Sequence, residues 1–317
     1  MPSRILVTGG AGFIGSHLVD SLVRRQFDVT VFDNLSAGNL KNLQESLTAA
    51  NCHFIEGDLK NSESIGKALQ QVELVYHFAA NPEVRDVDPT AHFSENQVAT
   101  FNLLESMRAT GARTIIFAST STIYGEASVR PTPENYGPLL PISTYGASKL
   151  ACEAMVASYA YTYGLRGLIL RLGNVIGARS NHGVIPDFLK KLKQNPDSLE
   201  VLGDGTQTKS YIHVADCISA IELVVMNFMG TDTRVDTYNV SSADQVSVLR
   251  IAEIVLEVAG VNARIKLTGG VDGGRGWMGD VKLMQLSNQK LRDLGWKEKY
   301  NSELAIKEAA KELTSQI

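Results

Sequence analysis

The chain has 317 residues, of which 44% are hydrophobic and 20% charged, with a net charge of −4. This balance is typical of a globular protein, and the lack of a long basic run excludes a phosphate-backbone binder, so we expect no nucleic-acid partner. No apolar stretch reaches the roughly 18 residues that span a bilayer, no secretion signal is visible, and the three scattered cysteines show no metal-like spacing, so we expect a cytoplasmic protein with no membrane partner and no metal.

The predicted elements alternate between strand and helix as far as Leu172. Apolar runs predict strands at residues 4–8, 28–32, 52–55, 74–78, 114–118 and 167–172. Helical spacing predicts helices at residues 13–25, 89–109 and 143–163. The strands are apolar without alternation, which is typical of a sheet covered on both faces. This order predicts an α/β fold with a Rossmann-type, doubly wound parallel sheet.

After Leu172 the pattern loosens into glycine-rich loops. Helices are predicted at residues 186–194, 214–229 and 248–259, and a strand at residues 237–240. We therefore expect a first domain over residues 1–172, with a returning segment near 213–244. Residues 173–317 are expected to form mainly a smaller, partly interleaved second domain.

The stretch VTGGAGFIGSH places Gly9, Gly12 and Gly15 between the first strand and the first helix. Such a turn lets the backbone approach a pyrophosphate at a helix N-terminus. Asp33 ends the second strand, where a carboxylate accepts from adenosine ribose hydroxyls and repels a 2′-phosphate, which favours NAD over NADP. The alternative is a plain glycine turn with a capping aspartate.

Tyr145 and Lys149 stand four residues apart in STYGASK and share one face of a predicted helix. A nearby ammonium would lower the phenol pKa from its usual value near 10, which would make Tyr145 a usable base. Such pairs also occur on surfaces without any function. The dinucleotide fingerprint upstream favours the catalytic interpretation.

These motifs, together with Asp33-Asn34, the GDL of Gly57–Leu59 and the HFAA of His77–Ala80, resemble the extended short-chain dehydrogenase/reductase family over the whole chain. Within that family, the stretches AANPEVR, STSTIYGE, HGVI and GDGTQTKSYIHV are most similar to the UDP-galactose (UDP-glucose) 4-epimerases of the shorter, archaeal type. The resemblance implies bound NAD in the first domain, a UDP-sugar substrate held mainly by the second, and a homodimer.

The resemblance also implies roles for single residues. The catalytic residues would be Tyr145, Lys149 and Thr120. The residues that bind NAD would be Gly9, Gly12, Phe13, Ile14, Gly15, Asp33, Asn34, Ser36, Asp58, Leu59, Phe78, Ala79, Ala80, Asn96, Ser119, Tyr145 and Lys149. The residues that bind the substrate would be Thr120, Asn174, Val184, Lys209 and Arg275. Lys209 stands where the family often has an arginine, and Leu172-Gly173 where bacterial epimerases usually have Tyr-Phe.

Four hydroxyl side chains follow the fifth strand in FASTSTIYGE, and we call Ser119, Thr120, Ser121 and Thr122 the hydroxyl cluster. Sugar dehydratases of the family carry an Asp-Glu pair in this segment to eliminate water, whereas hydroxyls only relay or hold a proton. The reaction should therefore stop at oxidation and reduction of sugar carbon 4. Ser119 and Thr122 serve either this chemistry or only the capping of the strand end.

The expected function is NAD-dependent 4-epimerisation of a UDP-hexose through a transient 4-keto sugar. The alternatives are a UDP-N-acetylhexosamine or UDP-uronate 4-epimerase, or a non-catalytic NAD-sensing module.

Five further residues receive structural interpretations. His77 and His213 are expected to pack at strand ends, His92 to be a solvated helix residue, and Trp296 to lie in the core. Arg85 either reaches the sugar or pairs with Asp86 or Asp88.

Overall fold

The computed structural model describes residues 4–85 and 88–315. The chain divides into two compact units. The first comprises the described residues up to Ile123, Thr144–Arg171 and Ile221–Tyr238, and the second comprises Tyr124–Ser143, Leu172–Ala220 and the described residues from Asn239 onward. Residues 124–143 thus belong to the second unit although they precede Leu172. The assignment of the units to cofactor and substrate stays a prediction.

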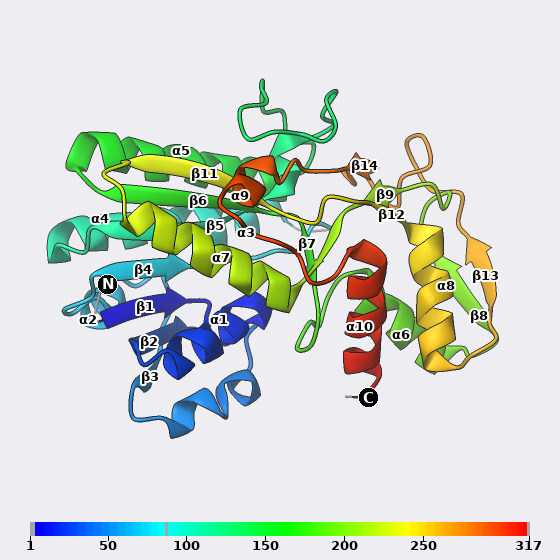
Figure 1. The fold of residues 1–317 in the computed structure, drawn as a ribbon, viewed down its shortest axis with the longest axis horizontal. Coiled ribbons are helices and arrows are strands. Elements are labelled where there is room, and N and C mark those ends of the chain that lie inside the picture. Colours follow the sequence, from blue (N-terminus) through cyan, green and yellow to red (C-terminus); the bar gives the residue numbers. More distant parts are fainter. Residues whose placement is uncertain (1–3, 86–87, 316–317) are drawn as a thin grey trace. The chain divides into compact units, whose positions relative to one another are not determined.

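The central sheet has seven strands in the order β11-β6-β5-β4-β1-β2-β3 (Figure 1). Its strands are β1 (Arg4–Thr8), β2 (Asp28–Asp33), β3 (Cys52–Glu56), β4 (Leu74–His77), β5 (Thr114–Thr120), β6 (Arg166–Leu172) and β11 (Val235–Val240). The pairs β1–β2, β1–β4, β2–β3 and β4–β5 are parallel. This arrangement confirms the predicted Rossmann-type sheet. The strand order reverses between β1 and β4, and ligands of such sheets bind at the carboxyl ends of the strands there.

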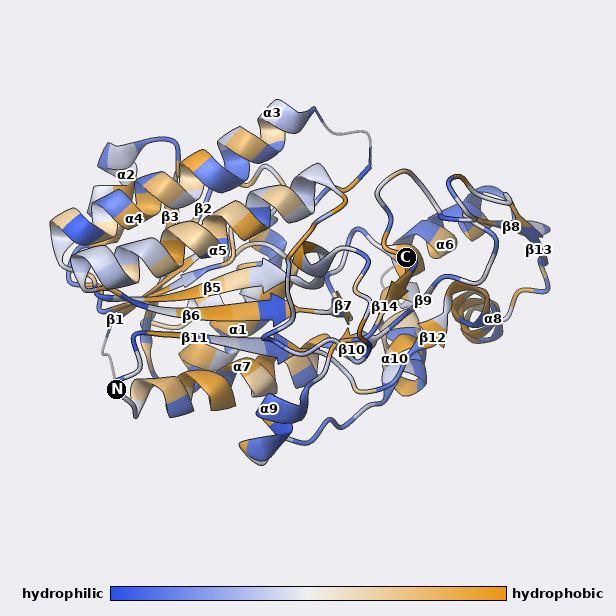
Figure 2. Ribbon diagram, turned by 90° about the horizontal axis from the view of Figure 1, so that it is seen from above, coloured by the Kyte–Doolittle hydropathy of each residue, from blue (hydrophilic) through white to orange (hydrophobic). Residues whose placement is uncertain are grey.

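Helices cover both faces of this sheet (Figure 2). They are α1 (Phe13–Arg24), α2 (Ser62–Ala68), α3 (Pro89–His92), α4 (Ala99–Thr110), α5 (Thr144–Tyr163) and α7 (Val214–Met229), with short 3₁₀ turns η1 (Leu40–Leu43), η2 (Ser46–Thr48) and η4 (Ser121–Tyr124). Leu103 and Met107 of α4, Val156 of α5 and Phe117 of β5 belong to one buried core. Burial of such side chains, worth about 1.5–3 kcal/mol each, holds α4 and α5 against β5.

The prediction of one continuous helix over residues 89–109 is wrong. The structure has α3, then a π-helical turn η3 (Phe93–Val98), and then α4. A π turn widens the helix by one residue and is frequent at functional sites. The turn contains the buried Asn96 and directly follows His92.

The second unit consists of small sheets and helices. Its strands are β7 (Asn174–Ile176), β8 (Ser198–Val201), β9 (Thr208–Lys209), β10 (Tyr211–His213), β12 (Val246–Ser247), β13 (Arg264–Leu267) and β14 (Leu283–Met284). Its helices are α6 (Val184–Gln194), α8 (Val248–Ala259), α9 (Gln289–Asp293) and α10 (Ser302–Thr314). Phe188 of α6, Ile251 of α8 and Ile306 of α10 share one core. Ser247 caps α8 by accepting from the Arg250 amide, which satisfies one of the open donors of the first turn.

Among the described residues, no helix combines the length and the apolarity that crossing a membrane requires. Cys52, Cys152 and Cys217 are free and buried, as expected for structural thiols.

Candidate active site

The glycine turn after β1 is packed too tightly for any other residue. Gly9 has a φ of +70°, and a Cβ on it would lie 2.5 Å from the backbone nitrogen of Ala79. A Cβ on Gly15 would lie 2.2 Å from the Gly9 carbonyl oxygen. Gly12 is the N-cap of α1, and no capping side chain accepts a hydrogen bond from the first amides of this helix. This cradle fits a dinucleotide pyrophosphate, which favours helix N-termini.

Asp33 at the end of β2 is fixed by two backbone amides. The amide of Ala11 donates to Oδ2 at 3.0 Å and the amide of Leu35 to Oδ1 at 2.8 Å. A carboxylate has about four acceptor positions, so two remain for other donors. The bonds orient Asp33, which is 8% exposed, as a preformed acceptor for ribose hydroxyls.

The polar residues after β2 bond to one another. The hydroxyl of Ser36 donates to Asn34 Oδ1 at 2.7 Å, and Asn34 Nδ2 donates to Asp58 Oδ2 at 3.3 Å. Leu59 is buried next to Asp58 in the sequence. The structure therefore brings together Asn34, Ser36 and Asp58 of the predicted adenosine site.

Phe78, Ala79 and Ala80 follow β4 and are partly buried. The amide of Phe78 donates to the Thr8 carbonyl at 3.0 Å, which holds this segment beside the glycine turn. His77, directly before them, bonds to the hydroxyls of Thr8 at 2.7 Å and Thr100 at 3.0 Å. Burial, with a smaller effect of the charge of Lys149, lowers the pKa of His77 to about 3. His77 thus packs at the strand end as predicted and stays neutral.

The phenol of Tyr145 forms a side-chain hydrogen bond with Thr120 at the end of β5. The Thr120 hydroxyl also accepts from the Thr122 amide at 3.2 Å and lies 3.2 Å from the Thr122 hydroxyl. The structure thus joins two of the three predicted catalytic residues, and it gives Thr120 a structural bond as well.

The predicted effect of Lys149 on the pKa of Tyr145 is wrong. Burial raises the pKa of Tyr145 to about 12, and the bond to Thr120 only partly offsets this. The Lys149 side chain is 2% exposed, and its Nζ lies 4.2 Å from the centroid of the Phe117 ring. Burial lowers the pKa of Lys149 to about 8, although Cys152 and Glu153 oppose the shift. The ammonium lies over the Phe117 ring of β5, and burial is the largest cause of the pKa shift of both Tyr145 and Lys149.

Sequence reasoning missed a buried carboxylate at the hydroxyl cluster. The Ser119 hydroxyl donates to Glu153 Oε1 at 2.5 Å, and Arg171 holds the same carboxylate through Nε at 3.1 Å and Nη2 at 2.8 Å. All three side chains are buried. The spacing was a usable signal, because Glu153 follows Lys149 by four residues on one helix face. The fork of Arg171 and the hydroxyl of Ser119 therefore both engage the Glu153 carboxylate, which leaves it tied to the fold.

Two bridges join the loop after β4 to α5. In the first, Asn96 accepts from the Asn81 amide at 2.7 Å and donates to the Ser148 hydroxyl at 2.9 Å. In the second, which we call the His92 bridge, Nε2 contacts the Glu83 carbonyl at 2.7 Å and Nδ1 contacts the Thr144 hydroxyl at 2.9 Å. Asn96 thus bonds to protein groups next to the predicted NAD site.

The prediction of a solvated His92 is wrong, because its side chain is 2% exposed. The side chain of His92 is enclosed between Glu83 and Thr144, to which its two ring nitrogens bond. The ring of His92 lies 5.9 Å from the ring of Tyr145, at an interplanar angle of 52°.

Apart from Thr120, the predicted substrate residues lie in the second unit, where carboxylates pair with both cations. Lys209 Nζ lies 2.6 Å from Asp280 Oδ1 and 5.5 Å from the Trp277 ring centroid. Arg275 pairs with Glu126 and, at 3.1 Å, with Asp272.

The two uncharged substrate residues of the second unit are Asn174 and Val184. Asn174 Nδ2 donates to the Ser210 carbonyl at 3.0 Å, which ties β7 to the segment before β10. Val184 is the first residue of α6.

Other residues have structural roles. His213 contacts Glu312 at 3.2 Å and the ring of Tyr300, and Trp296 is buried and donates to Ser219, both as expected for packing residues. Asp86, a proposed partner of Arg85, lies outside the described residues.

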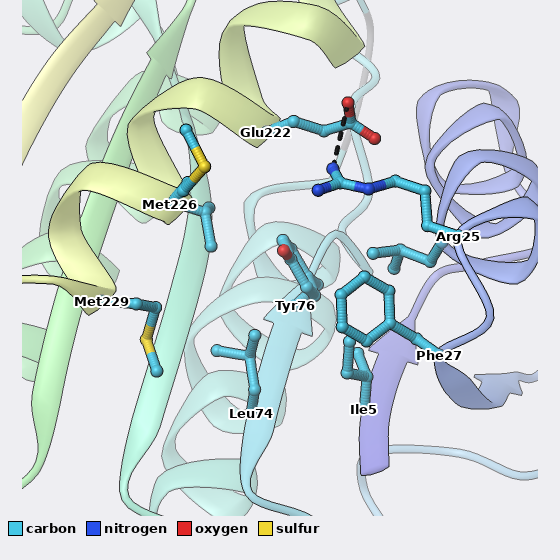
Figure 3. A pocket seen from close by; sticks show the side chains of 10 residues that line it. Ile5, Arg25, Phe27, Leu74, Tyr76, Glu222, Met226 and Met229 are labelled. Atoms are coloured by element: carbon cyan, nitrogen blue, oxygen red, sulfur yellow. Dashed lines mark ion pairs between the residues drawn. The ribbon is translucent and has the colours of Figure 1, made fainter. Parts of the chain in front are cut away.

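A cavity of about 30 Å³ lies at the opposite edge of the sheet from the predicted NAD site, next to the starts of β1 and β4 (Figure 3). Ile5, Leu74 and Tyr76 line it, and an ion pair of 3.3 Å joins Arg25 and Glu222 beside them. It has room for about one water molecule, which is far too little for a nucleotide. In the part of the chain that the structure describes, no cluster of histidine, cysteine, aspartate or glutamate could hold a metal ion.

Comparisons with known proteins agree with this geometry. The model of the NAD dependent epimerase/dehydratase family matches residues 5–241. UDP-glucose 4-epimerase of Corynebacterium glutamicum is 32% identical over 334 residues, which cover 99% of this chain and 96% of that protein. A crystal structure of UDP-galactose 4-epimerase has a TM-score of 0.90 and 46% identity, with 99% of both chains covered. UDP-glucose 4-epimerase of Thermus thermophilus in complex with NAD has a TM-score of 0.86 and 32% identity, covering 99% of this chain and all of that one. The chain therefore belongs to the NAD dependent epimerase/dehydratase family.

Proposed function

We propose that this protein catalyses the NAD-dependent 4-epimerisation of a UDP-hexose, UDP-galactose or UDP-glucose, through a transient 4-keto sugar. The observation that carries the proposal is the hydrogen bond between Tyr145 and Thr120 at the carboxyl end of β5. The carboxylate at the same cluster, Glu153, is already held by Arg171 and Ser119. The cluster therefore offers a proton relay and lacks a free acid that could eliminate water.

The residues of the first unit fit NAD, which supplies the hydride acceptor and donor when bound. Gly9, Gly12 and Gly15 leave room for the pyrophosphate, and Asp33 accepts from the ribose hydroxyls. We expect Tyr145 to take the proton of the sugar carbon 4 hydroxyl, with Thr120 as the bridge, because the positive charge that NAD would bring to the site would lower the phenol pKa from its value in the unliganded protein. Thr120 suits this role because a hydroxyl both accepts and donates.

Lys149 remains part of the proposed site as a buried cation and a ligand of the nicotinamide ribose. A pKa of about 8 leaves most of its amine charged near neutral pH. With NAD bound, return of the hydride to the other face of the 4-keto sugar would invert the centre, and Tyr145 would return the proton. No net oxidation results.

We propose that Asn174, Val184, Lys209 and Arg275 bind the UDP part of the substrate. Arg275 presents a planar fork that suits a diphosphate, and its present partners are carboxylates, which share the charge and the oxygen geometry of a phosphate. Lys209 is a point charge and cannot form a bidentate contact. Asp280 keeps its ammonium in place.

Incubation of the purified protein with UDP-galactose, UDP-N-acetylgalactosamine and UDP-galacturonate, with the products resolved by chromatography, tests the proposal. We expect conversion of UDP-galactose to UDP-glucose. Preferred conversion of either other substrate would favour the alternative epimerases. Turnover of none, with NAD bound, would favour a sensing module.

We also propose a cytoplasmic homodimer. Phe101 of α4 and Tyr161 of α5 are 46% and 66% exposed, and such apolar side chains are typical of an interface between copies. Light scattering of the purified protein distinguishes a dimer from a monomer.

A further inference from the structure

We propose that His92 is a positioning residue for Tyr145, which fixes the phenol through Thr144 and couples it to the loop of residues 81–85. The inference rests on the proposed epimerase function only for its catalytic consequence. Its structural part concerns the first unit alone.

The Glu83 carbonyl determines which nitrogen of the His92 ring donates. The Glu83 carbonyl only accepts, so Nε2 carries the proton and donates at 2.7 Å. In the neutral ring Nδ1 accepts from the Thr144 hydroxyl at 2.9 Å. Both ring nitrogens are thus satisfied, as burial requires. Because each bond has a defined direction, the ring is held in one orientation between the loop and α5.

The bridge ends on the residue directly before Tyr145. Thr144 is the first residue of α5, at the helix end where fraying is easiest. The His92 ring also contacts the Tyr145 ring, with centroids 5.9 Å apart. The phenol is therefore held at its hydroxyl by Thr120 and at its ring by His92. Loss of one contact would let the side chain turn about the other.

The Asn96 bridge follows the same plan one helical turn later and ends on Ser148, directly before Lys149. It joins Asn81 of the same loop to α5. The loop carries Arg85, one of the residues that we consider able to reach the sugar. A loop displaced by substrate would therefore act on Tyr145 through His92. A displacement of about 1 Å costs a positioned reaction up to about 100-fold in rate.

The test uses the full chain with four variants: His92→Phe, Thr144→Val, both together, and Thr110→Val as the control. His92→Phe keeps the ring contact and removes both hydrogen bonds. Thr144→Val removes the other end of the bridge with little change of shape, so it serves if His92→Phe does not fold. Thr110 is an exposed threonine at the end of α4, and its hydroxyl bonds within its own helix. Turnover of UDP-galactose and hydrogen exchange of the peptide over residues 144–149 are measured.

We expect His92→Phe and Thr144→Val each to lower kcat about 10–100-fold with little change in KM. The double variant should lose no more than the larger single loss, because both changes break one bridge. Exchange at residues 144–149 should be faster in all three than in the parent and the control. Parental kcat in the folded single variants, additive losses, or unchanged exchange would overturn the inference. A parent inactive on UDP-galactose would instead refute the proposed function, and the exchange result would still decide the role of His92.

Discussion

Replacement of Lys149 by methionine should make the protein more stable and much less active. At pH 7 the fold holds a charged amine whose pKa is about 8, against an ordinary value of 10.5. A pKa difference of about 2.5 corresponds to about 3 kcal/mol of unfolding free energy. Methionine removes this cost, and it also removes the contact of the ammonium with Phe117, which is worth about 1–2 kcal/mol. We therefore expect a net gain of about 1–2 kcal/mol at pH 7.

The pH dependence of the unfolding free energy tests this reasoning more directly. Between pH 8 and 10.5 the unfolded chain keeps the Lys149 proton and the folded chain has lost it, so parental stability rises with pH. Relative to Lys149→Met, the parent should gain about 2.5 kcal/mol from pH 7 to pH 10. Urea unfolding followed by circular dichroism at both pH values measures this. Lys67→Met, at an exposed lysine of α2, is the control and should show no such change. A difference in unfolding free energy between Lys149→Met and the parent that does not vary with pH would refute this reasoning. The kcat of Lys149→Met should fall at least 100-fold.

Three further predictions concern the hydroxyl cluster, the buried histidine and the cofactor. Thr120→Ala should lower kcat about 10²–10³-fold with a modest effect on KM, and Thr120→Ser should largely restore kcat. If steady-state kinetics give Thr120→Ala the parental kcat, the Thr120 hydroxyl is structural. Because the folded pKa of His77 is about 3 and its ordinary value is 6.5, the parent should lose about 2 kcal/mol between pH 6.5 and pH 5 relative to His77→Gln; equal losses in urea unfolding would contradict this. The purified protein should release NAD or NADH on denaturation; release of NADP would overturn the argument from Asp33.

The fold and the NAD side of the site were predictable from local sequence. Strand runs, the glycine spacing and Asp33 depend on residues close together in the chain, and the structure joins them as a doubly wound sheet requires. The approach of Gly9 to Ala79 follows from the position of β1 beside β4. Because alternating strands and helices favour one sheet topology, their order in the sequence was enough to predict this part of the fold.

The environment of the predicted catalytic pair, Tyr145 and Lys149, was not predictable in this way. Spacing placed Tyr145 and Lys149 on one helix face, but the pKa of each depends mainly on burial, and that of Lys149 also on Cys152 and Glu153. The prediction that His92 is solvated was wrong for a related reason. Its partners are the Glu83 carbonyl, nine residues away, and the Thr144 hydroxyl, 52 residues away, and no local pattern shows these contacts.

In the proposed 4-epimerisation, hydride leaves sugar carbon 4 and returns to the same carbon. UDP-galactose labelled with deuterium at carbon 4 tests this in the purified protein, with no added cofactor and the products analysed by NMR and mass spectrometry. We expect UDP-glucose that retains the deuterium at carbon 4, because the label would pass to bound NAD and back without exchange with water. Loss of the label to solvent, or accumulation of a dehydrated sugar, would contradict it.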